Sequence, residues 1–357
     1  MGKTFLSMVF GITCLIVGMV PSFAGWEVAE DCGDTTNLLG VAFATQENGA
    51  VVSENGNRIM FSNDGGMTWK PAKVDVDLSR HNMFDVIFSD TKTGWAVGSY
   101  DTGAGKRLAN LLKTTDTGAT WVNQPLPEDV VYSNPFRVWF DNKGNGWILT
   151  YGGHAIFRTS DEGKTWQQII FREVHPTIKN NAGWIHTGWH VFDSKHLIIC
   201  GQYGIIIETK DEGKTWTAID TGLTDLTEEG LKDLFFSDEK NGWAVGQKGV
   251  ILHTADGGKT WEKQSSGVPN SLERVQFIND KIGYAVGPAI YSAGASADRY
   301  GVLLYTEDGG KTWKNVNPTT ASLRGLSVLD AKHAWAVGGK GGSASEPKVM
   351  VVRCIED

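Results

Sequence analysis

One eight-residue pattern, Ser/Thr-x-Asp-x-Gly-x-Thr-Trp, occurs six times in this chain of 357 residues. The copies occupy 62–69, 114–121, 159–166, 209–216, 254–261 and 306–313. Their tryptophans follow one another at intervals of 52, 45, 50, 45 and 52 residues. Such a period is typical of a repeat architecture in which every repeat is one small structural unit.

A second motif, an apolar segment that runs into Gly-Trp-Ala-Val-Gly, precedes the boxes. It is clearest at 94–98, 242–246, 283–287 and 334–338, with weaker copies at 49–53, 146–150 and 197–201. One unit therefore reads as four short strands bounded by Gly and Asp turns, which predicts propeller blades rather than a sandwich. The 44 Gly and 14 Trp agree with many tight turns beside large packing residues.

The seventh unit has three predicted strands, at 323–328, 334–338 and 349–354, and no box. Residues 25–29 resemble the missing fourth strand, with Trp26 in the place of a box tryptophan. We therefore predict a seven-bladed all-β propeller with Asp-box (BNR-like) repeats, whose last blade is closed by the N-terminal strand. Such closure leaves no open sheet edge.

Residues 1–24 read as a signal peptide, with a basic Lys3, an apolar run and small residues before a cleavage point after Ala24. The apolar run is too short for a comfortable membrane span, which needs about 20 residues. Residues 25–357 are then one domain outside the cytoplasm, in the periplasm or the extracellular space. The 33 basic and 41 acidic residues give a net charge of −8, and such a chain is a poor nucleic-acid binder.

Each box Asp is predicted to accept hydrogen bonds from the backbone of its own turn, and each box Trp to pack against a neighbouring blade. One chemical task that is repeated around a ring is structural, so no catalytic residue, cofactor or metal is predicted. The structural residues are Asp64, Asp116, Asp161, Asp211, Asp256, Asp308, Trp69, Trp121, Trp166, Trp216, Trp261 and Trp313.

All boxes are expected on one face of the propeller, and the irregular insertions on the other. The insertions are 99–108, 171–187, 288–300 and 339–347. Insertions on one face of a repeat protein often mark its binding face.

Aligned first strands place basic and aromatic residues around the channel mouth on that open face. A basic rim would attract a carboxylate or an acidic peptide. The alternative is that each cation pairs with a local acid such as Asp233 or Glu273. The candidate partner-binding residues are Arg137, Lys232, Arg274, Arg324, Trp189 and His190.

The histidines and cysteines raise two further questions, whether the chain has a zinc site and whether it has a disulfide. His175, His186 and His190 are spaced by 11 and 4 residues, which matches no familiar zinc pattern. Cys32 and Cys354 are predicted at opposite ends of their strands, which argues against a disulfide across the ring closure.

The repeated boxes, the Gly-Trp-Ala-Val-Gly strands and the export signal resemble the photosystem II assembly and stability factor family. The resemblance covers residues 25–357 and is most specific from Phe236 to Trp261. It implies a non-catalytic exported scaffold that binds a membrane-protein subunit or complex, in the thylakoid lumen if the source is photosynthetic. An arginine-rich patch is implicated in binding in that family, and Arg137, Arg274 and Arg324 with Lys232 are the positions here that correspond to it.

Two other classes stay open from the residues alone. Sialidase-like glycoside hydrolases also carry Asp-boxes, and Asp85, Asp233 and Glu273 would supply the acids that such an enzyme needs. An extracellular peptide-binding propeller of the sortilin kind would bury a peptide in the channel without turnover.

Overall fold

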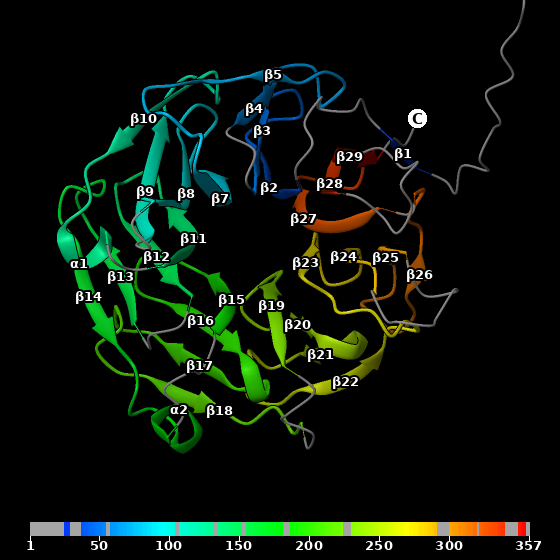
Figure 1. Cartoon of the computed structure of the whole chain (residues 1–357). Helices are drawn as coiled ribbons and strands as arrows, with labels where there is room; N and C mark the ends of the chain where they lie inside the picture. Colours follow the sequence, from blue (N-terminus) through cyan, green and yellow to red (C-terminus); the bar gives the residue numbers. More distant parts are fainter. Residues whose placement is uncertain are drawn as a thin grey trace, which may run out of the picture.

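A computed structural model describes residues 25–28, 37–54, 58–103, 107–131, 134–151, 155–180, 186–223, 230–290, 300–319, 321–339 and 349–354. Within these ranges the strands form seven sheets, which are arranged in a ring (Figure 1). The predicted all-β propeller architecture is confirmed.

The sheets are numbered here in chain order, and in sheets 1 to 6 the first strand lies innermost. Sheet 1 contains β2 (Leu38–Phe43), β3 (Gly49–Ser53), β4 (Ile59–Ser62) and β5 (Lys70–Pro71). Sheet 2 contains β7 (His81–Phe88), β8 (Gly94–Asp101), β9 (Arg107–Thr114), β10 (Thr120–Gln124) and β6 (Lys73–Val74). Sheet 3 contains β11 (Pro135–Phe140), β12 (Gly146–Thr150), β13 (Ala155–Thr159) and β14 (Gln167–Ile170). Sheet 4 contains β15 (His186–Val191), β16 (Leu197–Gly201), β17 (Ile206–Thr209) and β18 (Thr217–Ile219).

The remaining sheets complete the ring. Sheet 5 contains β19 (Leu231–Phe236), β20 (Gly242–Gly246), β21 (Val250–Thr254) and β22 (Glu262–Ser265). Sheet 6 contains β23 (Arg274–Phe277), β24 (Gly283–Gly287), β25 (Val302–Thr306) and β26 (Lys314–Asn315). Sheet 7 contains β27 (Ser322–Val328), β28 (Ala334–Gly339), β29 (Val349–Cys354) and β1 (Trp26–Val28). The short helices are α1 (Glu128–Val131), α2 (Pro176–Asn180) and the 3-10 turns η1 (Gln202–Gly204) and η2 (Gln247–Gly249).

The first and last described strands pair with each other. β1 lies antiparallel to β29, with Trp26 opposite Cys354 (Figure 1, dark blue beside red). The pairing that the sequence predicts is therefore present. Residues 1–24 and Cys32 lie outside the described residues, and so does the side chain of Cys354, so the signal peptide and the absence of a disulfide stay predictions.

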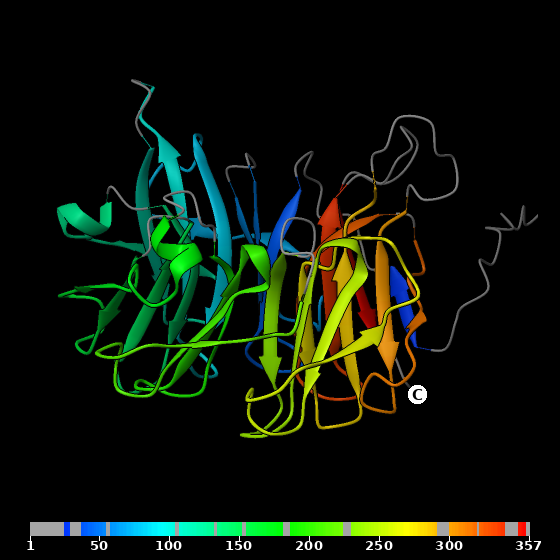
Figure 2. The same ribbon diagram turned by 90° about the horizontal axis from the view of Figure 1, so that it is seen from below.

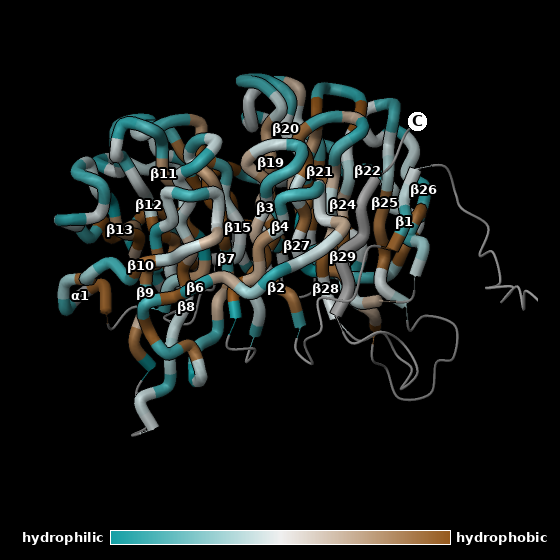
Figure 3. Tube along the Cα trace, turned by 90° about the horizontal axis from the view of Figure 1, so that it is seen from above, coloured by the Kyte–Doolittle hydropathy of each residue, from teal (hydrophilic) through white to brown (hydrophobic). Residues whose placement is uncertain are grey.

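One face of the ring is built from the boxes. In six sheets the residue after the box Asp donates its backbone N–H, over 2.9–3.0 Å, to a carbonyl of the turn between the first two strands. These pairs include Gly65 with Glu47 and Glu162 with Gly144. Both sets of turns therefore lie on one face of the ring (Figure 2), and many residues at the tips of this face are hydrophilic (Figure 3, upper edge).

The core is divided among the junctions between sheets. Each hydrophobic cluster of the described residues joins two adjacent sheets, and each box Trp belongs to, or packs against, the cluster shared with the preceding sheet. The recurring unit is a set of three rings. Trp335 of β28 stacks on Phe43 of β2 at 3.5 Å between centroids, and Phe43 meets Trp69 edge-on at 5.9 Å. Trp95–Phe140–Trp166 and Trp243–Phe277–Trp313 repeat this arrangement.

The glycine that opens the second strand makes room for this stack. A Cβ added to Gly242 would lie 2.6 Å from the ring of Phe236, closer than carbon atoms pack, and the following Trp243 stacks on Phe277 of the next sheet. The two residues of the Gly-Trp pair thus have complementary packing roles. The glycine leaves room for a phenylalanine ring of its own sheet, and the tryptophan packs against the next sheet.

Sheet 2 departs from the others in length. β7, β8 and β9 have eight residues each, whereas the first three strands of each other sheet, β27–β29 in sheet 7, have four to seven. The predicted insertion at 99–108 is thus largely a lengthened hairpin, which projects on the face opposite the boxes (Figure 2, cyan). Most of the insertions at 288–300 and 339–347, and part of that at 171–187, lie outside the described residues.

Candidate functional site

The central channel is a cavity of about 360 Å³, lined by the innermost strands of all seven described sheets. These are β2, β7, β11, β15, β19, β23 and β27. The cavity is therefore the one place where all repeats present the same strand to a common space.

A β-bulge sets which residues point into the channel. Six inner strands shift register near their start, for example between Met83 and Asp85 and between Leu231 and Asp233. The extra residue of a bulge is left out of the ladder and the next side chain is re-aimed. Lys232 and Arg324 are such extra residues, which places both at the channel mouth on the face opposite the boxes.

The bulge also corrects one predicted position. Arg137 pairs with Leu149, and the residue at the same level in sheet 4 is Gly188, which pairs with Cys200. Trp189 therefore lies one place further along. Aligning the first strands by sequence predicts that Trp189 and Arg137 occupy equivalent positions, and that prediction is wrong. A Cβ on Gly188 would lie 2.5 Å from the Cα of Asp233, so the crowded junction requires glycine.

Arg137 lies at the centre of a buried charge cluster. Its side chain is about 5% exposed, and its Nη2 lies 3.4 Å from Oδ1 of Asp233 while its Nη1 lies 4.0 Å from Oδ1 of Asp85. Nη2 also lies 3.4 Å from the Thr187 carbonyl. Arg137 therefore has the local acidic partners that the alternative reading requires, and it is not a free surface cation.

Both carboxylates serve a second partner. Oδ2 of Asp85 accepts the backbone N–H of Val138 at 3.1 Å, and Oδ2 of Asp233 accepts that of Val275 at 3.2 Å. Burial raises the pKa of both aspartates, and this effect exceeds the lowering of the pKa by the nearby Arg137 and Arg274. Burial and Arg137 lower the pKa of Arg274 to about 10, so it remains a cation at neutral pH.

These hydrogen bonds belong to a ring with one direction. A side chain of one inner strand accepts the backbone N–H of the next inner strand, and never the reverse among the bonds found in the described residues. The further pairs are His190 with Phe236 at 3.3 Å, Gln276 with Val328 at 2.8 Å and Ser327 with Phe43 at 3.2 Å. The channel polar groups therefore hold adjacent sheets together.

The six predicted partner-binding residues separate into two groups. Arg137 and His190 are engaged inside the protein, and burial lowers the pKa of His190 to about 4. Lys232 and Arg324 are half-buried near the mouth, whereas Arg274 lines the channel beside Arg137 and donates to the Glu273 carbonyl at 2.8 Å. No carboxylate of the described residues lies within 4.0 Å of the side-chain nitrogens of these three residues. Trp189 packs partly against the cluster between sheets 3 and 4.

Sequence reasoning missed an aromatic ladder near the start of the inner strands of sheets 2 and 3. Phe84 of β7 lies 6.1 Å from Phe136 of β11, which lies 5.8 Å from Tyr151 at the end of β12. Tyr151 is about 46% exposed, and the guanidinium of Arg137 lies 5.1 Å from the Phe136 ring. Phe84 and Phe136 are bulge residues, so only the register, which a single strand does not reveal, brings them together.

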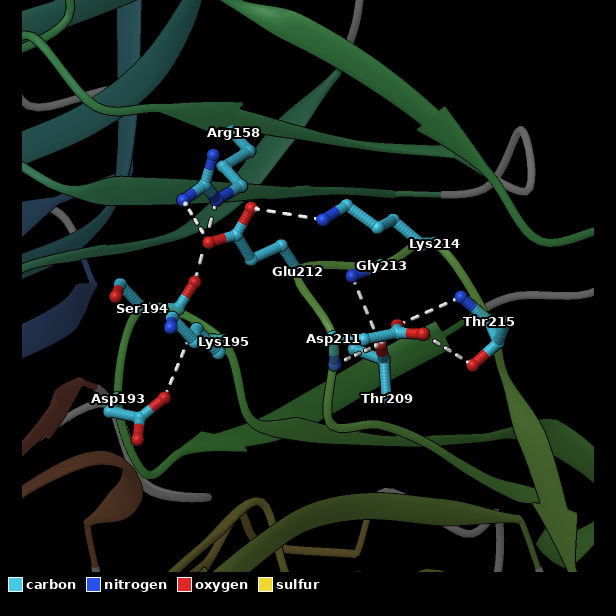
Figure 4. A network of polar contacts seen from close by, with 10 residues as sticks. All are labelled: Arg158, Asp193, Ser194, Lys195, Thr209, Asp211, Glu212, Gly213, Lys214 and Thr215. Carbon is cyan, nitrogen blue, oxygen red and sulfur yellow. Dashed lines mark hydrogen bonds and ion pairs between the residues drawn. The ribbon is translucent and has the colours of Figure 1, made fainter.

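The boxes carry the hydrogen bonds that the sequence predicts. In sheet 4, Asp211 accepts the backbone N–H of Thr215 at 2.8 Å and its hydroxyl at 2.6 Å, while the Thr209 hydroxyl accepts the N–H of Gly213 (Figure 4). The adjacent Glu212 reaches the previous sheet, where Arg158 lies 3.2 Å away. A carboxylate that is saturated by its own turn is a structural element rather than a catalytic acid.

The box aspartates predict a loss of stability in acid. Hydrogen bonds from the following threonine lower the pKa of Asp161, Asp256 and Asp308 to about 2 from 3.8. A lowered native pKa gives stability that is present above the unfolded value and is lost as pH falls through the native value. We expect the midpoint temperature of thermal unfolding to decrease as the pH is lowered from 3.8 to about 2.

The matched control is the triple variant Asp161→Asn, Asp256→Asn and Asp308→Asn, followed by circular dichroism over the same pH range. It should have a lower midpoint at pH 7 and a flatter pH dependence. An unchanged slope in this variant would assign the acid sensitivity to other groups.

No three His, Cys, Asp or Glu side chains of the described part are grouped as metal ligands. Among those residues, no helix has the length and apolar character that a membrane crossing requires.

The sequence was then compared with known proteins. It matches the family described as photosynthesis system II assembly factor YCF48 over residues 21–184 and 223–329. The chain belongs to this family. The resemblance inferred from the motifs is thereby confirmed.

Similar proteins of known description agree with the family. The photosystem II stability/assembly factor HCF136 of Arabidopsis thaliana is 22% identical over 85% of this chain and 74% of its own length. The photosystem II assembly lipoprotein Ycf48 of a Synechococcus strain is 23% identical over 93% and 91%. A solved structure described as YCF48 bound to D1 peptide has a TM-score of 0.71 at 22% identity, with 94% of this chain and 98% of that chain covered. This last likeness concerns the fold.

Proposed function

We propose that the chain is a non-catalytic exported scaffold that binds protein during the assembly of membrane-protein complexes. The observation that carries this proposal is membership of the YCF48 family over most of the chain. That family is one of assembly factors, and this chain is not an enzyme. The aspartates that a glycoside hydrolase would need are engaged, because Asp85 and Asp233 share Arg137 and each accepts a backbone N–H.

The finer architecture forms part of the proposal. The seven sheets are the blades of a seven-bladed propeller whose last blade is closed by the N-terminal strand, and 25–357 is a single domain. Residues 1–24 are a signal peptide, which directs the chain to the periplasm, or to the thylakoid lumen in a photosynthetic source. Relatives described as lipoprotein or chloroplastic agree with an exported protein.

The binding surface that we propose is the channel mouth opposite the boxes. Lys232, Arg274 and Arg324 supply positive charge there, and the ladder of Phe84, Phe136 and Tyr151 supplies aromatic surface. This combination suits an extended acidic peptide of a membrane-protein subunit, since cations and aromatic rings are the favoured anchors of interfaces. A related propeller has been solved with a D1 peptide, which supports a peptide as partner.

A variant that spares the buried arginine tests this surface. In Lys232→Ala/Arg324→Ala, two half-exposed charges are removed while the Arg137 cluster remains. Each charge is worth about 0.7 kcal/mol, so capture of a membrane-protein partner from native membranes should fall by about tenfold. Partners of tagged chains are quantified by mass spectrometry.

The matched control removes two exposed box lysines from the opposite face, in Lys259→Ala/Lys311→Ala. It should retain the partner at the unmodified level. If both variants capture the partner equally, the rim is not the binding surface. If the unmodified chain captures no protein, the scaffold proposal itself fails.

A further inference from the structure

The lengthened hairpin of sheet 2 concentrates polar atoms that lack hydrogen-bond partners. Across the described residues seven buried side-chain nitrogen or oxygen atoms are in this state, and three of them are Nδ1 of His81, Oγ of Ser99 and Oδ1 of Asn110. All three residues are at least nine-tenths buried. A buried polar atom without a partner costs about 1–3 kcal/mol. Two of the three atoms, those of His81 and Asn110, belong to side chains on the same face of the hairpin, which indicates a ligand site on that face.

Two of these residues, His81 and Asn110, line a common cavity. The cavity measures about 220 Å³ and is lined by His81, Asn110 and Tyr100, together with the amide side chains Asn123 and Gln124. Its apolar wall is formed by Val76, Ala109, Leu126 and Val131. None of these residues lines the central channel. The cavity is therefore separate from the proposed protein-binding surface.

The register explains why sheet 2 has this cavity. His81 pairs with Tyr100 and Asn110 with Gly98, so their side chains lie on one face of the hairpin. His81 and Tyr100 belong to the extra length of β7 and β8, beyond the shared repeat.

The lining defines the chemistry of the occupant. No charged side chain lines the cavity, which favours a neutral ligand. The amide nitrogen of Asn110 is directed to the sulfur of Met83 at 3.7 Å, which leaves its oxygen to accept from an incoming O–H or N–H group. The His81 ring stacks on Tyr100 with centroids 4.8 Å apart and planes at 26°, which forms an aromatic wall.

Burial lowers the pKa of His81, against smaller opposing effects of Asp77 and the Leu78 carbonyl, so the ring is neutral at pH 7. A neutral imidazole beside an amide oxygen suits a hydroxyl that can both donate and accept. The volume is below the usual range of drug-sized pockets, which is about 300–1,000 Å³, and suits a single ring. We propose that this cavity binds a phenol, either as a free small molecule or as a tyrosine side chain of another protein.

The test uses the full mature chain and three probes of one size. p-Cresol, toluene and benzoate are compared by saturation-transfer NMR and by titration. p-Cresol should bind, and toluene should bind about tenfold more weakly because it leaves Asn110 and His81 unpaired. Benzoate should not compete with p-cresol. Equal binding of p-cresol and toluene, or no binding of p-cresol, would overturn the proposal and leave a solvent-filled cavity.

Variants place the probe in the cavity. Asn110→Leu removes the acceptor at similar volume and should weaken p-cresol by about tenfold, while the exposed control Asn63→Leu should not. p-Cresol binding that is the same in both variants would overturn the assignment. If Asn110→Leu does not fold, the probe series on the unmodified chain still decides. A Gly-Tyr-Gly peptide distinguishes a free phenol from a tyrosine side chain as the natural ligand. The peptide can bind only if the opening of the cavity is wide enough for a side chain that is attached to a backbone.

Discussion

Replacement of Arg137 by methionine is expected to lower the free energy of unfolding by about 3–5 kcal/mol, because among the described residues Arg137 is the only cation within 4.0 Å of two buried carboxylates. Asp85 and Asp233 both lie within 4.0 Å of the guanidinium. Chemical denaturation at pH 7, followed by tryptophan fluorescence, measures the loss. The same change at the half-exposed Arg324 should cost less than about 1 kcal/mol.

Two further measurements identify the cause. Adding Asp85→Asn and Asp233→Asn to Arg137→Met should restore part of the stability, since an amide oxygen can still accept the neighbouring N–H. The deficit of Arg137→Met should also grow as pH rises. Burial raises the pKa of both aspartates in the native state. An acid with a raised native pKa contributes stability that is fully present below its pKa in the unfolded chain. This stability is lost as the pH rises through its native pKa. A deficit that is independent of pH would mean that lost packing, not charge, is responsible.

Replacement of Trp26 by alanine should cost about 3–5 kcal/mol, the usual loss for a buried tryptophan. Trp26 is about 5% exposed and meets Tyr284 of sheet 6 edge-on at 5.4 Å. It thus seals the junction between sheets 6 and 7, where no box tryptophan is available. Denaturation of the folded variant measures the loss, and limited proteolysis should show cleavage first near the chain ends.

Val28 provides the matched control on the same strand. Its side chain is about 45% exposed, so Val28→Ala should change the free energy of unfolding by less than about 0.5 kcal/mol. If Trp26→Ala and Val28→Ala behave alike, β1 contributes little and the ring closes without it.

The parts of this fold that sequence predicts are those that are encoded locally. A box needs only eight consecutive residues, because Asp211 is satisfied by Thr215 four positions later. The position of Trp26 follows from the same local pattern. These features recur with every repeat, so each copy corroborates the others.

What sequence did not predict depends on register between strands. The bulge before Asp85 shifts one strand against its neighbour, and the one before Gly188 changes which residue faces the channel. Arg137 finds its acids 52 residues before and 96 residues after itself in the chain, so its burial is a property of the closed ring. The cavity beside His81 likewise needs the pairing of three strands.

The pairing of β1 with β29 makes completeness of the chain a condition for its compact state. Strand β1 pairs with β29, the last described strand. A polypeptide that stops before Val349 therefore has no strand to pair with β1, and the outer edge of β28 has no hydrogen-bonded neighbour. Such an edge invites pairing with other chains or attack by proteases. A chain that is truncated before Val349 should therefore be cleaved by proteases faster than the full-length chain.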